Sequence, residues 1–188
     1  MFAVRKLSAC DADQLKGHLR RLSADDVRLR FGHAVKDAGL DSYAEAIDWS
    51  QTWAVGVFDK DRLHGVVELR RIGSCWSRNA ELSVSVEGPY QKQGLGTRLV
   101  AEALLVARNR GLRTVFLLCL PDNQPIKKIV RKFSGELTAV EGDVEARIRT
   151  MQPTPLSVMT EVFGDGCALL LSLLGQSTDV PMGGRGRA

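Results

Sequence analysis

The sequence predicts an α/β fold in which a mixed sheet is flanked by helices, with an extra helical segment near the C-terminal end. Residues 52–86 contain alternating segments rich in β-branched side chains, which favour strands. Residues 96–111 repeat apolar side chains at helical spacing. Residues 113–120 are apolar without alternation, which is typical of a strand covered on both faces. This order of strands and helices indicates an α/β architecture.

The first 50 residues predict one short strand followed by helices. Residues 3–7 are a candidate strand, and the apolar spacing of residues 8–35 favours two helices. Ser23, with Asp26 three places on, can start the second of these helices. Residues 42–49 predict another short helical piece.

The central segments predict a hairpin, a third strand and the clearest helix. Residues 52–58 and 63–72 alternate around a polar break, and residues 79–86 continue the sheet. The helix at residues 96–111 has one apolar face and ends where Gly111 can stop it. After the strand at 113–120, further segments predict a helix at 125–133 and short strands at 137–140 and 144–148.

The chain changes character after this sheet, which divides it into residues 1–150 and a C-terminal helical extension and tail at 151–188. Thr154 and Pro155 form a helix start, and the segment that follows is amphipathic. We expect this extension to pack on its own domain. A homodimer contact through its leucines is the alternative.

Composition indicates one domain of ordinary size. The 188 residues include 44% hydrophobic side chains, enough for a proper core. The net charge of +4 predicts a solvated basic surface. The arginines are scattered along the chain and only 6% of residues are aromatic, so we expect no nucleic-acid partner.

The chain shows no sign of export or of a membrane anchor, so we expect a cytoplasmic protein without a membrane partner. The longest apolar cluster, at 167–174, is too short to span a bilayer. The cysteines are far apart, which favours reduced, mostly buried thiols over a zinc site or a disulfide framework. They are Cys10, Cys75, Cys119 and Cys167.

The segment VEGPYQKQGLGTRLV, residues 86–100, combines glycines with the start of the predicted helix. Such a turn exposes backbone N–H groups at the positive end of a helix dipole, where a phosphate can bind. A Walker A loop requires Gly-Lys-Ser/Thr, which is absent here, and a dinucleotide fingerprint requires glycine in place of Leu99. The pattern Gln/Arg-x-x-Gly-x-Gly/Ala is met at each fixed position between Gln91 and Gly96.

With this loop between a strand and a helix, the sequence resembles the GNAT superfamily of acyl-CoA-dependent N-acyltransferases over residues 4–149. Three segments, LRRLSADDVRLRF, AIDWSQTWAVGVF and AELSVSVEGPYQKQGLGTRLV, are similar to the acetyltransferase domain of bacterial protein-lysine acetyltransferases. We expect no counterpart, in these 188 residues, of the regulatory regions that are fused to some of those proteins. The resemblance implies a mostly antiparallel central sheet and acetyl-CoA as cosubstrate, with no metal.

The resemblance also implies the residues that hold acetyl-CoA. The backbone of Val84 and Val86 would lie beside the pantetheine arm, and Asn123 would contact that arm or cap the next helix. Backbone amides of the loop would bind the pyrophosphate, at Gln91, Lys92, Gln93, Gly94, Leu95, Gly96 and Thr97.

Amine acylation requires a base, because an alkylamine with a pKa of about 10.4 arrives protonated. Glu81 matches the glutamate that the resembled lysine acetyltransferases use as general base, and an apolar acyl pocket would make it a stronger base. Its alternative role is an exposed strand residue paired with Arg70 or Arg78. The N–H near Val84 would stabilise the oxyanion of the tetrahedral intermediate. Many GNAT enzymes have, where this chain has Val130, a tyrosine that acts as general acid and protonates the departing thiolate.

Other candidate residues favour structural roles. Glu68 is a reserve base, although a solvent-facing strand position is the better interpretation. Ser83 and Ser85 lack a nearby histidine and acid in the sequence, which disfavours a serine hydrolase. The three histidines show no metal-ligand spacing and are interpreted as surface or packing residues. They are His18, His33 and His64.

The sequence therefore predicts an acetyl-CoA-dependent N-acetyltransferase with a protein lysine as its leading acceptor. A small amine is the alternative acceptor. An open acidic groove beside Glu81 would favour a protein, and a closed pocket would favour a metabolite. The rival function is a noncatalytic acyl-CoA-binding regulatory module, for which the absence of a tyrosine at Val130 is the main support.

Overall fold

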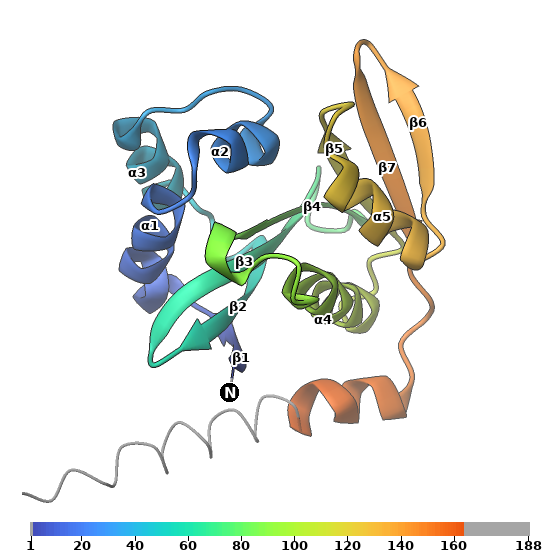
Figure 1. Cartoon of the computed structure of the whole chain (residues 1–188). Coiled ribbons are helices and arrows are strands. Elements are labelled where there is room, and N and C mark those ends of the chain that lie inside the picture. The colour runs from blue at the N-terminus through green and yellow to red at the C-terminus, as the bar shows by residue number, and fades with distance from the viewer. Residues whose placement is uncertain (1, 164–188) are drawn as a thin grey trace, which may run out of the picture.

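The computed structural model describes residues 2–163, in which seven strands form one mixed sheet of order β1-β2-β3-β4-β5-β7-β6 (Figure 1). All neighbouring strands are antiparallel except β4 and β5, which are parallel. The predicted α/β class and mostly antiparallel sheet are confirmed. The strands are β1 (Ala3–Leu7), β2 (Thr52–Asp59), β3 (Arg62–Arg71), β4 (Asn79–Val86), β5 (Thr114–Cys119), β6 (Glu136–Val140) and β7 (Asp143–Arg149).

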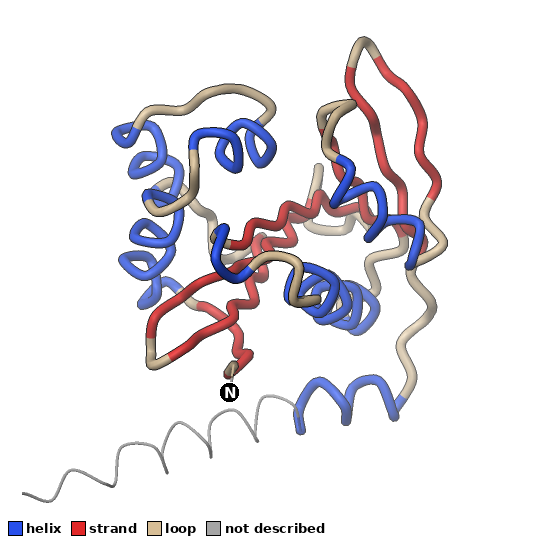
Figure 2. The backbone as a smooth tube through the Cα atoms, viewed as in Figure 1, coloured by secondary structure: helices blue, strands red, loops and turns tan. Residues whose placement is uncertain are grey.

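Helices cover the sheet on both sides, with α1, α2 and α3 gathered apart from α4 and α5 (Figures 1 and 2). Ser23 caps α2 by accepting a hydrogen bond from the N–H of Asp26, as predicted. Gly111, in the left-handed conformation, follows the end of α4. The helices are α1 (Ala12–Arg20), α2 (Ala24–Phe31), α3 (Asp37–Glu45), α4 (Leu95–Asn109) and α5 (Gln124–Lys132).

Alternation along the inner strands produces two separate cores. Val55 and Val67 face a core that includes the buried side of α4 and α5. Ala54 and Val66, their neighbours in the chain, face a second core formed with α1, α2 and α3. Because each inner strand is covered on both faces, β3 is buried over most of its length.

Two predicted elements differ from the structure. The short helix expected at 42–49 is α3, which begins earlier, because its buried pair Leu40 and Ala44 lies four residues apart on one face. The prediction that residues 113–120 are covered on both faces is wrong. Leu118 is 62% exposed, because α1, α2 and α3 cover the first strands of the sheet and leave this face of β5 open.

The helix predicted after Thr154 begins at residue 155 and is described as far as residue 163. Thr154 and Ser157 exchange backbone-to-side-chain hydrogen bonds at its start. Glu161 contacts Lys6 of β1 and Asn109 of α4, so this part of the extension packs on its own domain, as expected. The tail and the leucine-rich segment predicted as a dimer contact lie outside the described residues.

The described cysteines are free thiols, but their exposure differs from the prediction. Cys119 is buried in β5, whereas Cys10, in a single 3-10 turn at residues 9–11, and Cys75, in a turn after β3, are exposed. The expectation of mostly buried thiols is therefore wrong for these two, and Cys167 lies outside the described residues. Among residues 2–163, every helix is too short or too polar to cross a membrane.

Candidate functional site

The parallel strands β4 and β5 separate after only three residue pairs. Asn79, Ala80 and Glu81 pair with residues 114–116 of β5, and beyond Glu81 the structure describes no further pairing between the two strands. The remaining part of β4 therefore presents one edge of its backbone to an opening in the middle of the sheet. Backbone groups at such an edge remain available for a ligand.

The hydrogen bonds of β4 determine which residues face this opening. The N–H of Glu87 donates to the carbonyl of His64, and the carbonyl of Asn79 accepts from the N–H of Ile72. The backbone groups of odd-numbered residues in β4 therefore form hydrogen bonds with β3. Alternation directs the backbone of Val84 and Val86 toward β5. The carbonyl of Val86 accepts a hydrogen bond from the Gln91 side chain at 2.9 Å.

The glycine loop follows directly and leads into α4. Lys92 and Gly94 have positive φ angles of 59° and 82°, which turn the chain sharply into the helix. The N–H groups of Leu95, Gly96 and Thr97 belong to the first turn of the helix and have no intrahelical acceptors. They form a concentration of donors at the positive end of a 15-residue helix, which fits a pyrophosphate.

Gly96 lies where α4 packs closely against α5. A Cβ atom at this position would lie 3.3 Å from Cδ1 of Ile129. Gly94 instead has open space around its missing Cβ, so its requirement is the left-handed backbone. The two glycines of the predicted motif therefore serve different physical purposes.

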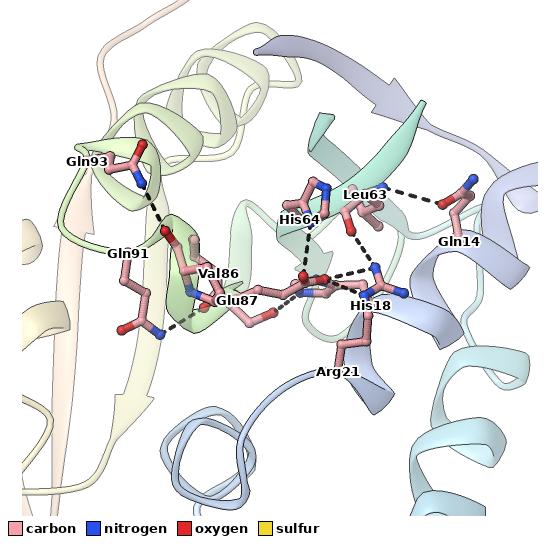
Figure 3. A network of polar contacts seen from close by, with 11 residues as sticks. Gln14, His18, Arg21, Leu63, His64, Val86, Glu87, Gln91 and Gln93 are labelled. Atoms are coloured by element: carbon pink, nitrogen blue, oxygen red, sulfur yellow. Dashed lines mark hydrogen bonds and ion pairs between the residues drawn. The ribbon is translucent and has the colours of Figure 1, made fainter. Parts of the chain in front are cut away.

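Side chains of the loop fix its shape. The amide of Gln91 also donates to Asp26 of α2 at 2.8 Å. Gln93, labelled in Figure 3, donates to the carbonyl of Pro89 at 3.0 Å. The loop is thus tied to the end of β4 and to the N-terminal helices.

Helix α2 also contacts the other side of the opening. Arg28 forms an ion pair with Asp122, at 2.7 Å, in the turn after β5. Asn123 donates to the carbonyl of Leu29 at 3.4 Å. Together with the bond between Asp26 and Gln91, these contacts make α2 a bridge between the two edges of the opening.

Asn123 caps α5, because its side chain accepts from the N–H of Ile126 at 3.3 Å. This is the structural role that the sequence left open beside cofactor contact. Val130, seven residues on, is fully buried in the core between α4, α5 and the sheet. Its side chain has no proton to donate to a leaving group.

Glu81 lies at the last pair before β4 and β5 separate, beside Phe116 of β5. Its carboxylate accepts a hydrogen bond from Arg70, across the strand pair with β3, at 2.5 Å. This ion pair is the alternative role that the sequence proposed for Glu81. The Glu81 side chain is 42% exposed, so a solvent-borne amine can reach it.

Glu68, expected to face solvent, is instead buried. It lies on β3 opposite Ser83, and its two oxygens accept from Arg30 at 2.8 Å and from the hydroxyl of Tyr43 at 2.7 Å. Burial raises the pKa of Tyr43 to about 12, so this hydroxyl remains a donor. The reserve base is therefore engaged by two partners beneath the N-terminal helices.

Ser85 has a histidine and an acid as neighbours in space, which its sequence surroundings do not show. Nε2 of His18 lies 2.9 Å from Oγ of Ser85, and Nδ1 of His18 lies 3.1 Å from Oε1 of Glu87. A carboxylate only accepts, so Nδ1 carries the proton and Nε2 accepts from the serine. The order matches a hydrolase triad. Because His18 is fully buried, a substrate cannot reach it. These hydrogen bonds instead link α1 to β4.

Glu87 is the centre of this network (Figure 3). Its carboxylate also accepts from Nε of Arg21 and Nδ1 of His64, each at 2.9 Å. Burial would raise the pKa of Glu87, but the hydrogen bonds from His18, His64 and Arg21 outweigh it and lower the pKa to about 2. The network anchors the end of β4 directly before the glycine loop.

The stability of the fold is expected to decrease in acid through this network. The folded pKa of Glu87 lies below its ordinary value of 4.5, so its contribution is present above pH 4.5 and is lost as the pH falls toward about 2. Burial lowers the pKa of His18 from 6.5, which adds a loss of stability below pH 6.5 as the unfolded chain takes up a proton.

The variant Glu87→Gln is expected to unfold more easily at pH 7, by on the order of 3 kcal/mol, and to lose the steep dependence between pH 4.5 and 2. Urea unfolding at several pH values measures both effects. Glu45→Gln, at an exposed pair with Lys16, is the matched control. An unchanged pH dependence in Glu87→Gln would contradict the assignment of the acid sensitivity to this carboxylate.

The model of the Acetyltransferase (GNAT) family matches residues 19–135 of the chain. Among solved structures, the GNAT domain of S. lividans PAT is similar with a TM-score of 0.68 at 20% identity, over 78% of this chain and 89% of that chain. PaiA N-acetyltransferase from Thermoplasma acidophilum in complex with coenzyme A has a TM-score of 0.60 at 18% identity, over 79% and 99%. YncA, a putative acetyltransferase from Salmonella typhimurium with its cofactor acetyl-CoA, has 0.62 at 14%, over 82% and 96%.

Proposed function

The chain belongs to the acetyltransferase (GNAT) family, and we propose that it transfers an acetyl group from acetyl-CoA to the ε-amine of a protein lysine. The observation that carries the proposal is the separation of β4 and β5 beside a glycine loop that opens α4. A thioester with a long arm and a pyrophosphate matches an open strand edge followed by a cluster of amide donors.

Acetyl-CoA supplies the activated acyl group. We propose that the amides from Gln91 to Thr97 bind its pyrophosphate and that the backbone of Val84 and Val86 holds the pantetheine arm. The bond from Gln91 to the carbonyl of Val86 joins these two parts of the site. The NH2 group of Asn123 donates to the carbonyl of Leu29 and carries a second N–H, which can contact the same arm.

Glu81 is the proposed general base. Its position at the last pair before the strands separate lies next to the opening, and its exposure allows a lysine side chain to approach. Binding of an ammonium group at this carboxylate competes with Arg70 for the same oxygens. The carboxylate then accepts a proton from the amine, while the N–H of Val84 donates to the carbonyl oxygen of the acyl group.

The chain has Val130, and not a tyrosine, at the position from which a general acid would protonate the departing coenzyme A thiolate. A thiol with a pKa of about 8.5 is a tolerable leaving group without protonation, so the step does not require one. This interpretation predicts slower turnover than in an enzyme whose general acid protonates the thiolate. Since the missing acid does not prevent the reaction, we prefer an enzyme to a noncatalytic acyl-CoA sensor.

The exposed surroundings of Glu81 favour a protein acceptor. Leu118 of β5 is open to solvent, and Arg70 is exposed beside the carboxylate. The surface is open, as expected for a lysine presented by another protein, but its charges are basic. We therefore expect lysines flanked by acidic residues to be preferred, since those residues complement Arg70.

The test is release of coenzyme A from acetyl-CoA with a panel of acceptors. The panel contains lysine peptides with acidic flanks, matched peptides with basic flanks, free lysine and a simple alkylamine. The expected result is release that depends on the peptide and is fastest with acidic flanks. Release with small amines alone would favour a metabolite acceptor. Tight binding of acetyl-CoA without release from any acceptor would favour the sensor and contradict the proposal.

A further inference from the structure

A cavity lies beside Thr114, where the pairing of β4 with β5 begins, whereas the opening between these strands lies beyond their last pair. Residues 150–153, which also line the cavity, follow the end of β7. Its volume is about 760 Å³, within the range of roughly 300–1,000 Å³ that small-molecule sites occupy. Among the described residues, its lining contains no aspartate or glutamate. It contains Arg71, Arg78, Arg110, Arg113, Arg147 and Arg149.

The sheet brings these arginines together although the sequence scatters them. The N–H of Arg113 donates to the carbonyl of Arg78 at 2.7 Å, and the N–H of Thr150 donates to the carbonyl of Arg113 at 3.0 Å. Arg149 lies opposite Thr114 in the pairing of β5 with β7. The three arginines thus lie at the ends of neighbouring strands, which are about 5 Å apart in a sheet. Arginines that the sequence scatters along the chain therefore gather at one end of the sheet, where most of them are exposed.

Within residues 2–163, most of this positive charge is not neutralised by carboxylates, although Arg147 forms an ion pair with Glu145 at 3.5 Å. In residues 2–163, the guanidinium groups of Arg78, Arg113 and Arg149 have no hydrogen bond, ion pair or ring contact. Arg71 donates to the carbonyl of Cys75 and has a buried Nε without a partner. Arg110 is the member that reaches a carboxylate of the extension, Glu161 at 3.2 Å.

An exposed indole lies at the same cavity. Trp76, which also lines it, is 89% exposed. An exposed indole ring can stack on a flat partner, and a purine or pyrimidine base presents such a face. Guanidinium groups match the geometry of phosphate oxygens by paired donors.

We propose that this cavity binds a nucleoside polyphosphate, with Arg78, Arg113 and Arg149 on the phosphates and Trp76 on the base. The chemistry favours this class because three unpaired cations and one stacking surface share a cavity of ligand size. It is separate from the proposed acetyl-CoA site, so it can be occupied together with coenzyme A.

Protection of Cys75 from alkylation tests occupancy. Cys75 lines the cavity, whereas Cys10, also an exposed thiol, lies at the start of the N-terminal helices and serves as control within the same molecule. Coenzyme A at saturating concentration keeps ATP from the acetyl-CoA site. ATP is expected to slow iodoacetamide modification of Cys75 several-fold, by peptide mass spectrometry, and to leave Cys10 unchanged. If ATP left the modification rate of Cys75 as unchanged as that of Cys10, the proposal would be overturned.

Calorimetric titration of variants, again with coenzyme A saturating, tests the roles. Arg149→Ala is expected to weaken ATP binding roughly ten-fold. Arg62→Ala, an exposed arginine at the other end of β3, is the matched control and should leave it unchanged. Trp76→Ala should weaken the binding of ATP and leave the binding of inorganic tripolyphosphate unchanged.

Three results would overturn the assignment: equal binding of tripolyphosphate and ATP by the native chain, an equal effect of Arg149→Ala and Arg62→Ala, and binding confined to single-stranded oligonucleotides or acidic peptides. Turnover of acetyl-CoA is measured separately, so failure here leaves the proposed acetyltransferase activity standing.

Discussion

The variant Glu81→Gln is expected to lower turnover by roughly 10²–10⁴-fold while acetyl-CoA binds with unchanged affinity. Glutamine has nearly the same shape as glutamate but cannot accept the proton of the incoming ammonium. Because the backbone of β4 and the loop would hold acetyl-CoA, the donor site is untouched. Coenzyme A release measures the first effect, and calorimetry with acetyl-CoA measures the second.

Arg70→Gln is the matched control, because it breaks the same ion pair and keeps the carboxylate. If Glu81 acts as a base, Arg70→Gln retains most of the turnover with a saturating acceptor that has no acidic flanks. If the ion pair is what matters, the two variants fail alike. The deficit of Glu81→Gln should also shrink as the pH rises toward about 10.4, where lysine loses its proton without help. A pH-independent deficit would argue against proton transfer.

The variant Glu68→Ala is expected to lower the free energy of unfolding by about 3–5 kcal/mol, which makes it the largest predicted change in stability. Arg30 and Glu68 have side chains only 7% and 4% exposed, so removal of the carboxylate leaves a buried cation without its counter-ion. Tyr43 would lose its acceptor at the same time. Urea unfolding at pH 7 gives the free energy directly.

The double variant Arg30→Met/Glu68→Met separates charge burial from loss of packing. Removal of both charges leaves no uncompensated ion, so the double variant should be clearly more stable than Glu68→Ala. A double variant at least as unstable as Glu68→Ala would mean that side-chain packing, and not the unpaired cation, dominates at this site.

The local features of the fold could be predicted because each is encoded over a few neighbouring residues. The helix after the glycine loop shows its apolar face within four turns, and the loop shows its glycines. Exposure of β5 could not be predicted, because Leu118 is apolar whether or not a helix covers it. Coverage depends on where α1, α2 and α3 end in space, which no local pattern records.

The polar network could not be predicted for the same reason. His18 and Glu87 are 69 positions apart, and their contact exists because α1 packs on the face of β4 that carries the odd-numbered side chains. One signal was present: Ser83, Ser85 and Glu87 alternate as polar side chains toward a face that would otherwise be apolar. Such a pattern predicts buried polar partners on the covering helices.

The alternation of β4 has a consequence for how relatives of this chain can diverge. In the proposed mode of binding, peptide groups at Val84 and Val86 contact the donor, and every amino acid except proline supplies the same peptide groups. Side chains at these positions are then constrained by packing alone. If the proposal holds, substitutions at Val84 and Val86 that keep the packing preserve donor recognition, while changes at exposed positions around Glu81 and Leu118 alter the choice of acceptor. One scaffold can thus acquire new acceptors through surface change and keep a single donor.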